Sequence, residues 1–180
     1  MDIMQNSAVV GSTYIEVGIK AEKKKNLLTL YVKDDGWGMD EETVRKVSDP
    51  FYTTRTTRKA GLGIPLLRMS AEMAGGGISI ESEPGRGTTV TAVYEIDNID
   101  RKPLGDVGET MAISIMGNPA LEYHLLLSND DEEYVFRTED VRKQIGDLPI
   151  NDTVIIGYLK EMISEQVNRI FGGILNEIIS

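Results

Sequence analysis

The chain contains no cysteine and only one histidine, His124. Disulfides, thiolate nucleophiles and cysteine-based zinc or iron–sulfur sites are therefore excluded, and so is a metal cluster built from histidines. No run approaches the roughly 18 consecutive apolar residues that a membrane span needs, and the first residues do not read as a signal peptide. We therefore expect a cytoplasmic protein with no membrane partner.

Basic residues are also scarce. Lys and Arg total 19 against 29 Asp and Glu, which gives a net charge of -10 and a pI near 4.6. Such a chain repels a phosphate backbone on average, so nucleic acid is not an expected partner. In contrast, hydrophobic residues make up 41% of the 180 residues, as is usual for a soluble globular protein with a packed core.

The first half of the chain alternates between strand and helix patterns. Apolar residues at every second position predict a strand from Thr13, and another after the polar stretch Lys23 to Asn26, so that the two form a β-hairpin. Asp40 can cap a short helix. A further helix and a second hairpin are expected over residues 61–74, 78–82 and 88–96. This mixture predicts a mixed sheet with helices on one face, hence an α/β or α+β fold, and we expect the α+β class.

The alternating strand and helix patterns stop at Asp97 to Pro103, a charged stretch that ends in a proline, and we expect a domain boundary there. It would separate a domain of residues 1–99 from a smaller C-terminal α+β unit of residues 104–180, a helix, hairpin and helix with no motif that indicates chemistry. In that unit the expected helix caps are Asp106, Thr138 and Asp152, and the expected strands are residues 121–128 and 133–137.

One segment that carries chemistry lies at the end of the second strand. Asp34 is followed by Gly36, Gly38 and Met39, so a carboxylate meets a backbone with few side chains. A carboxylate can accept a hydrogen bond from the exocyclic amine of adenine, and glycines let a ring approach the main chain. The same letters also occur in ordinary turns, so the motif alone leaves both interpretations open.

A second segment is Gly61-Leu62-Gly63 at the start of a predicted helix. Free N–H groups and the helix dipole at such a place favour phosphate oxygens. Arg55, Arg58 and Lys59 lie just before it in an otherwise acidic chain. The alternative is a solvated basic loop whose glycines only permit close packing.

The third segment is Asp2 with Asn6, which share a face if the segment is helical. An amide oxygen suits a Mg²⁺ ion that bridges phosphates, and a carboxylate one turn earlier could orient a water or accept a proton. For an isolated pair, a polar helix end is the alternative interpretation.

Together, in this order and spacing, the segments resemble the GHKL superfamily of ATP-binding proteins, which includes gyrase, Hsp90, histidine kinases and MutL. The resemblance is strongest to the catalytic ATP-binding domain of histidine kinases and covers roughly the first 96 residues. The matching stretches are an N box at Asp2 to Asn6 with the MutL-like Gly11-Ser12-Thr13, a first glycine box at Asp34 to Met39, an F box at residues 49–54, a second glycine box at residues 60–64, and a closing hairpin with Gly85-Arg86-Gly87-Thr88.

This resemblance implies a Bergerat fold, a two-layer α/β sandwich that binds ATP with Mg²⁺. It implies that Asn6 holds the metal, that Asp2 is the catalytic carboxylate, and that residues 53–60 form a short ATP lid. The implied nucleotide-binding residues are Asp34, Gly36, Gly38, Met39, Arg55, Arg58, Lys59, Gly61, Leu62, Gly63 and Thr88, of which Thr88 would support adenine through a water.

Two departures from the family pattern matter. Asp2 stands where gyrase-type ATPases have a longer glutamate, so we expect weak or no intrinsic ATPase activity. The chain also begins inside the N-box helix, and the element that precedes this helix in relatives is missing. Either residues before Met1 or another segment of the chain is therefore expected to complete the sheet.

Two functions fit these expectations. In the first, the module transfers the γ-phosphoryl group of Mg·ATP to a partner protein in signalling. In the second, it is a non-catalytic, ATP-dependent switch that binds a partner through its lid or its C-terminal unit. The layout of residues 104–180 resembles the tail of stand-alone ATP-binding proteins found beside iron-only hydrogenase components in anaerobic bacteria. The expected partner is thus a phosphoacceptor or a component of a redox enzyme.

Overall fold

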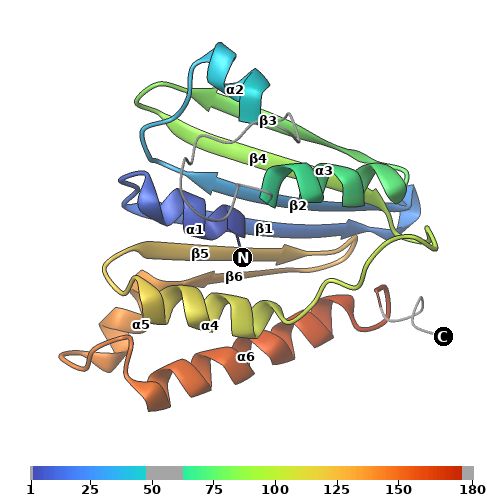
Figure 1. Ribbon diagram of the computed structural model, residues 1–180. Helices are drawn as coiled ribbons and strands as arrows, with labels where there is room; N and C mark the ends of the chain where they lie inside the picture. The colour runs from blue at the N-terminus through green and yellow to red at the C-terminus, as the bar shows by residue number, and fades with distance from the viewer. Residues whose placement is uncertain (1, 48–62, 176–180) are drawn as a thin grey trace.

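A single mixed sheet of six strands organises the molecule (Figure 1). The computed structural model describes residues 2–47 and 63–175. The strand order is β3-β4-β2-β1-β5-β6. The strands are β1 (Tyr14–Glu22), β2 (Leu27–Asp34), β3 (Gly77–Glu83), β4 (Gly87–Glu95), β5 (Glu122–Ser128) and β6 (Glu133–Arg137). The helices are α1 (Asp2–Val9), the short 3-10 helix η1 (Lys23–Lys25), α2 (Glu41–Val47), α3 (Gly63–Met73), α4 (Val107–Gly117), α5 (Thr138–Ile145) and α6 (Thr153–Phe171).

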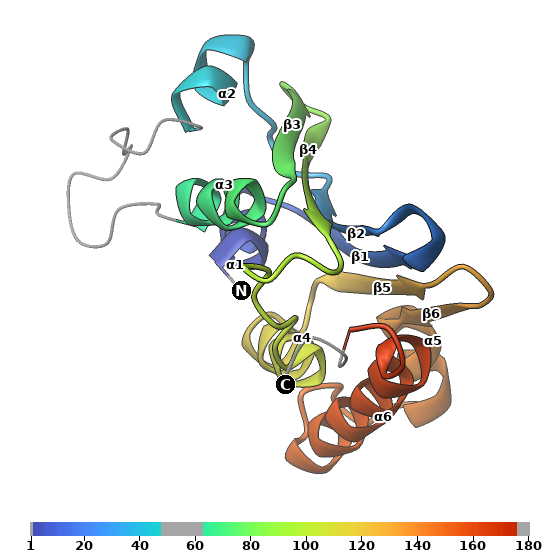
Figure 2. The ribbon, with the colours of Figure 1, turned by 90° about the vertical axis from the view of Figure 1, so that its right-hand side faces the viewer.

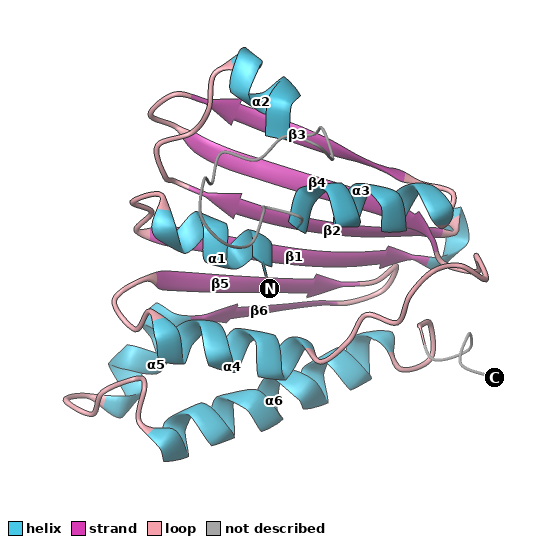
Figure 3. Cartoon of the chain, viewed as in Figure 1, coloured by secondary structure: helices cyan, strands magenta, loops and turns pink. Residues whose placement is uncertain are grey.

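Both expected hairpins of the first half are present. Strands β1 and β2 pair antiparallel, as do β3 and β4, and β4 also pairs antiparallel with β2. Asn26 closes the first hairpin with a left-handed backbone, φ 55°. Helices α1 and α3 lie side by side over this part of the sheet (Figure 3). The predicted α+β class, a mixed sheet with helices on one face, is thus confirmed.

Strand β5 connects the C-terminal segment to the rest of the sheet. It pairs in parallel with β1, and β6 pairs antiparallel with β5 at the edge. Because β4 and β5 run in the same direction, the chain must cross over two strands between them, and α4 lies in that crossover connection. The other side of β1 is therefore completed by another segment of the same chain, one of the two possibilities that the sequence left open.

The expected boundary at residues 97–103 falls in this crossover connection, where Arg101 is buried. Arg101 Nε donates to the carbonyl of Ile96 at 2.8 Å, and its guanidinium also lies 3.4 Å from the carbonyl of Leu175 beyond α6. Burial lowers the pKa of this guanidinium. Arg101 thus links the connection to Leu175, the last residue that the structure describes. The division of the chain into two domains stays a prediction.

The core lies on the helix-bearing face of the sheet and is continuous across both halves of the chain. Ile15 of β1 and Leu125 and Leu127 of β5 are fully buried on that face, each with 0% exposed area, and Val17, Leu30 and Val32 are partly buried beside them. Helices α4 and α6 cover the β5 end through Met111, Ile115, Leu159 and Ile163 (Figure 2).

Three of the four expected helix caps are present. The carboxylates of Asp40, Asp106 and Asp152 accept hydrogen bonds from backbone N–H groups of the first turn, at 2.7 to 2.8 Å. The fourth expectation, Thr138, is wrong. Its side chain is buried and donates to Glu122 of β5 at 2.6 Å, and the same Glu122 carboxylate accepts the N–H of Glu139.

The opposite face of the sheet carries a polar cluster across β2, β1 and β5. The hydroxyls of Tyr14 and Tyr31 both donate to the carboxylate of Glu16. Burial and this carboxylate raise the pKa of both phenols above their ordinary range. The Tyr14 hydroxyl also lies 3.2 Å from Nδ1 of His124, and their rings meet edge to face. Because Tyr14 gives its one hydrogen to Glu16, the histidine is the donor in that contact.

We expect the packing of α4 against α6 to depend on Gly108. A Cβ at this position would lie 2.2 Å from Ser164 Oγ and 2.6 Å from the carbonyl of Lys160. Gly108→Ala should therefore lower the free energy of unfolding by about 1 to 3 kcal/mol in urea titrations.

Gly117, in the same helix, is the matched control because a Cβ there would meet no atom within 4 Å. Gly117→Ala should leave stability unchanged or raise it by up to about 1 kcal/mol. Equal effects of the two substitutions would show that the two helices are not packed as closely as described.

Candidate functional site

Asp34, the last residue of β2, occupies the centre of the candidate site. It is only 5% exposed and lies between Ile15 of β1 and Thr88 of β4. Ser7 Oγ of α1 donates to Asp34 Oδ2 at 2.6 Å, and the N–H of Gly36 donates to Oδ1 at 3.0 Å. A buried carboxylate with one protein donor on each oxygen keeps lone pairs for a further donor, as the adenine interpretation requires.

The next residue, Asp35, joins the beginning of β1 to the end of β2. Its carboxylate accepts the N–H and hydroxyl hydrogens of Thr13, at 2.8 and 2.5 Å, and the N–H of Tyr14 at 2.9 Å. Burial by itself would raise the pKa of Asp35, but these hydrogen bonds outweigh it and hold the pKa below its ordinary value. Asp35 is thus a structural carboxylate that joins two strands.

The glycines around Asp34 lie in close contact with other segments of the chain. A Cβ on Gly36 would lie 2.7 to 2.9 Å from atoms of Val10 and Ser12, and one on Gly38 (φ +65°) would lie 2.0 Å from the carbonyl of Glu83. The glycines therefore serve chain packing, as the turn interpretation implies, and the adenine interpretation of the motif stays a prediction.

A hydroxyl pair continues the site onto β3 and β4. Ser82 Oγ lies 2.9 Å from Thr88 Oγ1, donates to the carbonyl of Gly87 at 3.0 Å and accepts the N–H of Met39 at 2.8 Å. Thr88 and Met39, both predicted from sequence, are thus brought to the same end of the sheet as Asp34.

Helix α1 places the predicted N-box pair beside this end. Met4 and Ser7 are buried, whereas Asn6 is exposed. Asp2 precedes Asn6 by four residues in the same helix, so the two positions share a face. The amide of Asn6 is consequently free of the core packing that holds Met4 and Ser7.

Only part of the predicted phosphate-binding segment is described. Gly63 is the first residue of α3. Arg55, Arg58, Lys59, Gly61 and Leu62 lie outside the described residues, as do the expected F box and lid.

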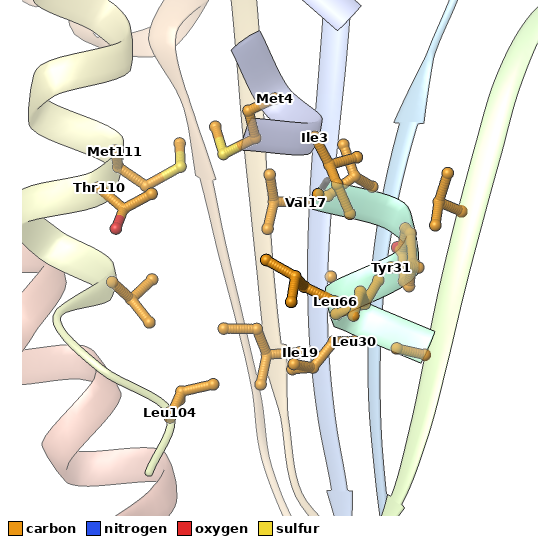
Figure 4. Close-up of a pocket in the computed structure, with 17 residues that line it drawn as sticks. Ile3, Met4, Val17, Ile19, Leu30, Tyr31, Leu66, Leu104, Thr110 and Met111 are labelled. Carbon is orange, nitrogen blue, oxygen red and sulfur yellow. The ribbon is translucent and has the colours of Figure 1, made fainter. Parts of the chain in front are cut away.

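A largely apolar pocket of about 420 Å³ adjoins this site. It lies over β1 and β2 between α1, α3 and α4, and Figure 4 shows Leu66 on one side facing Met111 and Thr110 on the other. Val32 and Val90, which also line it, are the next cross-strand pair after Asp34 and Thr88 on the same face of the sheet. The pocket thus extends from the Asp34 end toward Ile19 and Leu104.

Comparison with known proteins decides the family. The model of the histidine kinase-, DNA gyrase B- and HSP90-like ATPase family matches residues 2–98, more than half of the chain. The chain belongs to this family. Residues 2–98 accordingly form an ATP-binding module of the histidine-kinase-like type, and the resemblance inferred from the sequence is confirmed.

Two curated relatives are sensor proteins. Sensor protein SrrB of Staphylococcus aureus strain NCTC 8325 / PS 47 is 37% identical over 79 residues, which are 41% of this chain and 14% of SrrB. SrrB of strain COL gives the same values. This chain thus spans only a small part of the length of these relatives.

A solved structure supports the fold alone. The crystal structure of the N-terminal domain of a DNA repair protein aligns with a TM-score of 0.50 at 14% identity, over 74% of this chain and 49% of that one.

Within residues 2–47 and 63–175, no helix is long and apolar enough to cross a membrane.

Two residues of this candidate site, Ser7 and Ser82, were not predicted from the sequence. Each is a single serine in no recognisable pattern, and its importance comes from a partner contributed by another element, Asp34 for Ser7 and Met39 for Ser82. Trp37, inside the glycine box, is 70% exposed, and its indole lies beside Gly11.

We predict that Gly87→Ala disturbs the site much more than Gly85→Ala. Both glycines have positive φ, +88° and +77°, so each substitution carries a backbone cost of about 1 to 2 kcal/mol. At Gly87 a Cβ would also lie 1.9 Å from the carbonyl of Asp34, whereas at Gly85 nothing lies within 4 Å. Urea unfolding should show a loss for Gly87→Ala that exceeds the loss for Gly85→Ala by about 1 to 3 kcal/mol. Similar losses would contradict the contact with Asp34.

Proposed function

We propose that the chain binds Mg·ATP at the Asp34 end of the sheet and transfers its γ-phosphoryl group to a partner protein in signalling. The observation that carries this proposal is the buried Asp34 carboxylate, held by Ser7 and Gly36 at the end of β2 in a chain of the ATPase family. The Asp34 carboxylate accepts a hydrogen bond from the exocyclic amine of adenine, and the Thr88 hydroxyl binds the same ring through a water.

The phosphates would extend from this base site along α1 toward the beginning of α3. Gly61, Leu62 and Gly63 then donate backbone N–H groups to phosphate oxygens, and Arg55, Arg58 and Lys59 add positive charge. The amide oxygen of Asn6 fits a Mg²⁺ ion, which takes one or two protein oxygens and completes its shell with phosphates and water. The bound ion would neutralise charge on the β- and γ-phosphates.

In the transfer step, a nucleophilic side chain of the partner forms a bond to the γ-phosphorus. The bond from that phosphorus to the β–γ bridging oxygen breaks, and ADP leaves with the electron pair. The chain's own residues hold the nucleotide in line for this attack and stabilise the charge that develops. Asp2, one turn before Asn6, is the candidate to accept a proton, and its short side chain is the reason to expect weak attack by water.

The second candidate is an ATP-dependent switch that binds a partner without phosphorylating it. An observation that favours it is a group of large apolar side chains exposed on the C-terminal segment. Leu148 is 61% exposed, Val154 78% and Tyr158 67%. Exposed apolar groups of this size are typical of protein–protein contacts, and they lie far in sequence from the nucleotide motifs. Labelling of the partner with a γ-phosphoryl group separates the two candidates.

Asp34→Ala tests the adenine assignment. The substitution removes the acceptor for the adenine amine, and an unpaired buried donor costs about 1 to 3 kcal/mol, or roughly 5- to 150-fold in affinity. Calorimetric titration with ADP and Mg²⁺ should show this loss, while Asp131→Ala in the exposed β5–β6 turn should bind as the original chain does. Unchanged ADP affinity in a folded Asp34→Ala protein would contradict the assignment.

Asp2→Asn tests the predicted weakness of ATP hydrolysis. We expect slow steady-state release of phosphate by the chain alone, and little further decrease in the variant, because Asp2 reaches less far than a glutamate. Phosphate release and transfer of labelled phosphate to a partner are measured on the same preparations. Rapid release that Asp2→Asn abolishes would place the chain among efficient ATPases instead.

A further inference from the structure

Ser7 makes a buried contact that the family motifs do not assign. Its side chain is on the inner face of α1, the residue is only 4% exposed, and Oγ lies 2.6 Å from Oδ2 of Asp34. The contact joins two elements 27 residues apart in the chain. It therefore links the helix that carries Asn6 to the carboxylate proposed to bind the base.

The two donors on Asp34 act on different oxygens. The terminal torsion of an aspartate is broad, so a single hydrogen bond to one oxygen leaves the carboxylate plane able to turn about that contact. Gly36 N–H holds Oδ1 at 3.0 Å, and Ser7 Oγ holds Oδ2. The serine is thus the donor that fixes the plane, because Gly36 alone would hold only one edge.

The contact of Ser7 with Asp34 also determines that the groups around the proposed adenine position are hydrogen-bond acceptors. A serine hydroxyl has one hydrogen, and Ser7 gives it to Asp34, so Ser7 Oγ and both carboxylate oxygens keep only lone pairs for a ligand. A purine with an amine at C6 supplies the hydrogen that these acceptors need. A purine with a carbonyl at C6 would place another acceptor against the Asp34 carboxylate. The two acceptors then face each other in a buried site with no hydrogen between them, which weakens binding.

We propose that Ser7 is a positioning residue that orients the Asp34 carboxylate so that the site selects 6-amino purine nucleotides and rejects 6-oxo purine nucleotides. This inference rests on the proposed binding of a nucleotide at Asp34 and goes beyond it by assigning the selectivity to a second side chain. Ser7 acts through Asp34 and is not a catalytic residue.

Ser12, five residues after Ser7 and beyond the end of α1, provides a matched control. Its hydroxyl donates to the backbone carbonyl of Ser7 at 2.6 Å, so it anchors the end of α1 without touching Asp34. Ser12→Ala removes this anchor and leaves the hydroxyl of Ser7 in place. A purely structural role of the region would make both serines behave alike, whereas a positioning role separates them.

The experiment measures the dissociation constants of ADP and of inosine diphosphate, which has a carbonyl at C6, by calorimetry with Mg²⁺. The original chain should prefer ADP by at least about tenfold. Ser7→Ala should reduce this preference by about tenfold, and Ser12→Ala should leave it within about twofold even if stability falls. Ser7→Cys, which nearly keeps the side-chain volume with a weaker donor, should behave as Ser7→Ala does and covers the case in which the alanine variant fails to fold.

The outcomes separate this inference from the proposed function. If neither nucleotide binds the original chain, the proposed function is wrong. If both bind equally, or if Ser7→Ala and Ser7→Cys keep the full preference for ADP, nucleotide binding stands and the role of Ser7 is wrong. If Ser12→Ala loses the preference as strongly as Ser7→Ala, the effect comes from the helix end and the positioning role is also wrong.

Discussion

Strand β5 lies along the free side of β1, and the arrangement of the whole chain follows from this parallel pairing. It places Tyr123, Leu125 and Leu127 on the same face as Ile15 and Ile19, where all five are buried. The helices that follow and precede β5 then cover that face, so a single core runs under both halves. At about 25 cal/mol per Å² of buried apolar surface, such side chains are the main source of stability for the sheet.

The candidate site depends on the same sheet in a different way. It lies at the end of β2 and the beginning of β4, next to the turns of the chain. Asp35 fastens the end of β2 to the beginning of β1, which leaves Asp34 buried between neighbouring strands. A rigid sheet thus presents one carboxylate, and the loops around it carry the glycines that let main-chain segments meet there.

Local chemistry explains which features the sequence could predict. The hairpins and the caps at Asp40, Asp106 and Asp152 depend on residues close together in the chain, and the structure confirms them. Thr138 shows the limit, since Glu122 on a neighbouring strand accepts the N–H bond at that helix start. The pairing of β5 with β1 and the contact of Ser7 with Asp34 are likewise set by tertiary packing, which alternation of apolar residues does not encode.

The cluster of Tyr14, Glu16 and His124 has a practical consequence for spectroscopy. His124 is the only histidine and Trp37 the only tryptophan of the chain, so each gives a single, unambiguous signal. The imidazole resonances report on the junction between β1 and β5, where His124 meets Tyr14. The indole fluorescence reports on the glycine turn beside Asp34, where Trp37 covers Gly11. The native chain thus carries two separate spectroscopic probes, one for the pairing of β1 with β5 and one for the candidate site, without any added label.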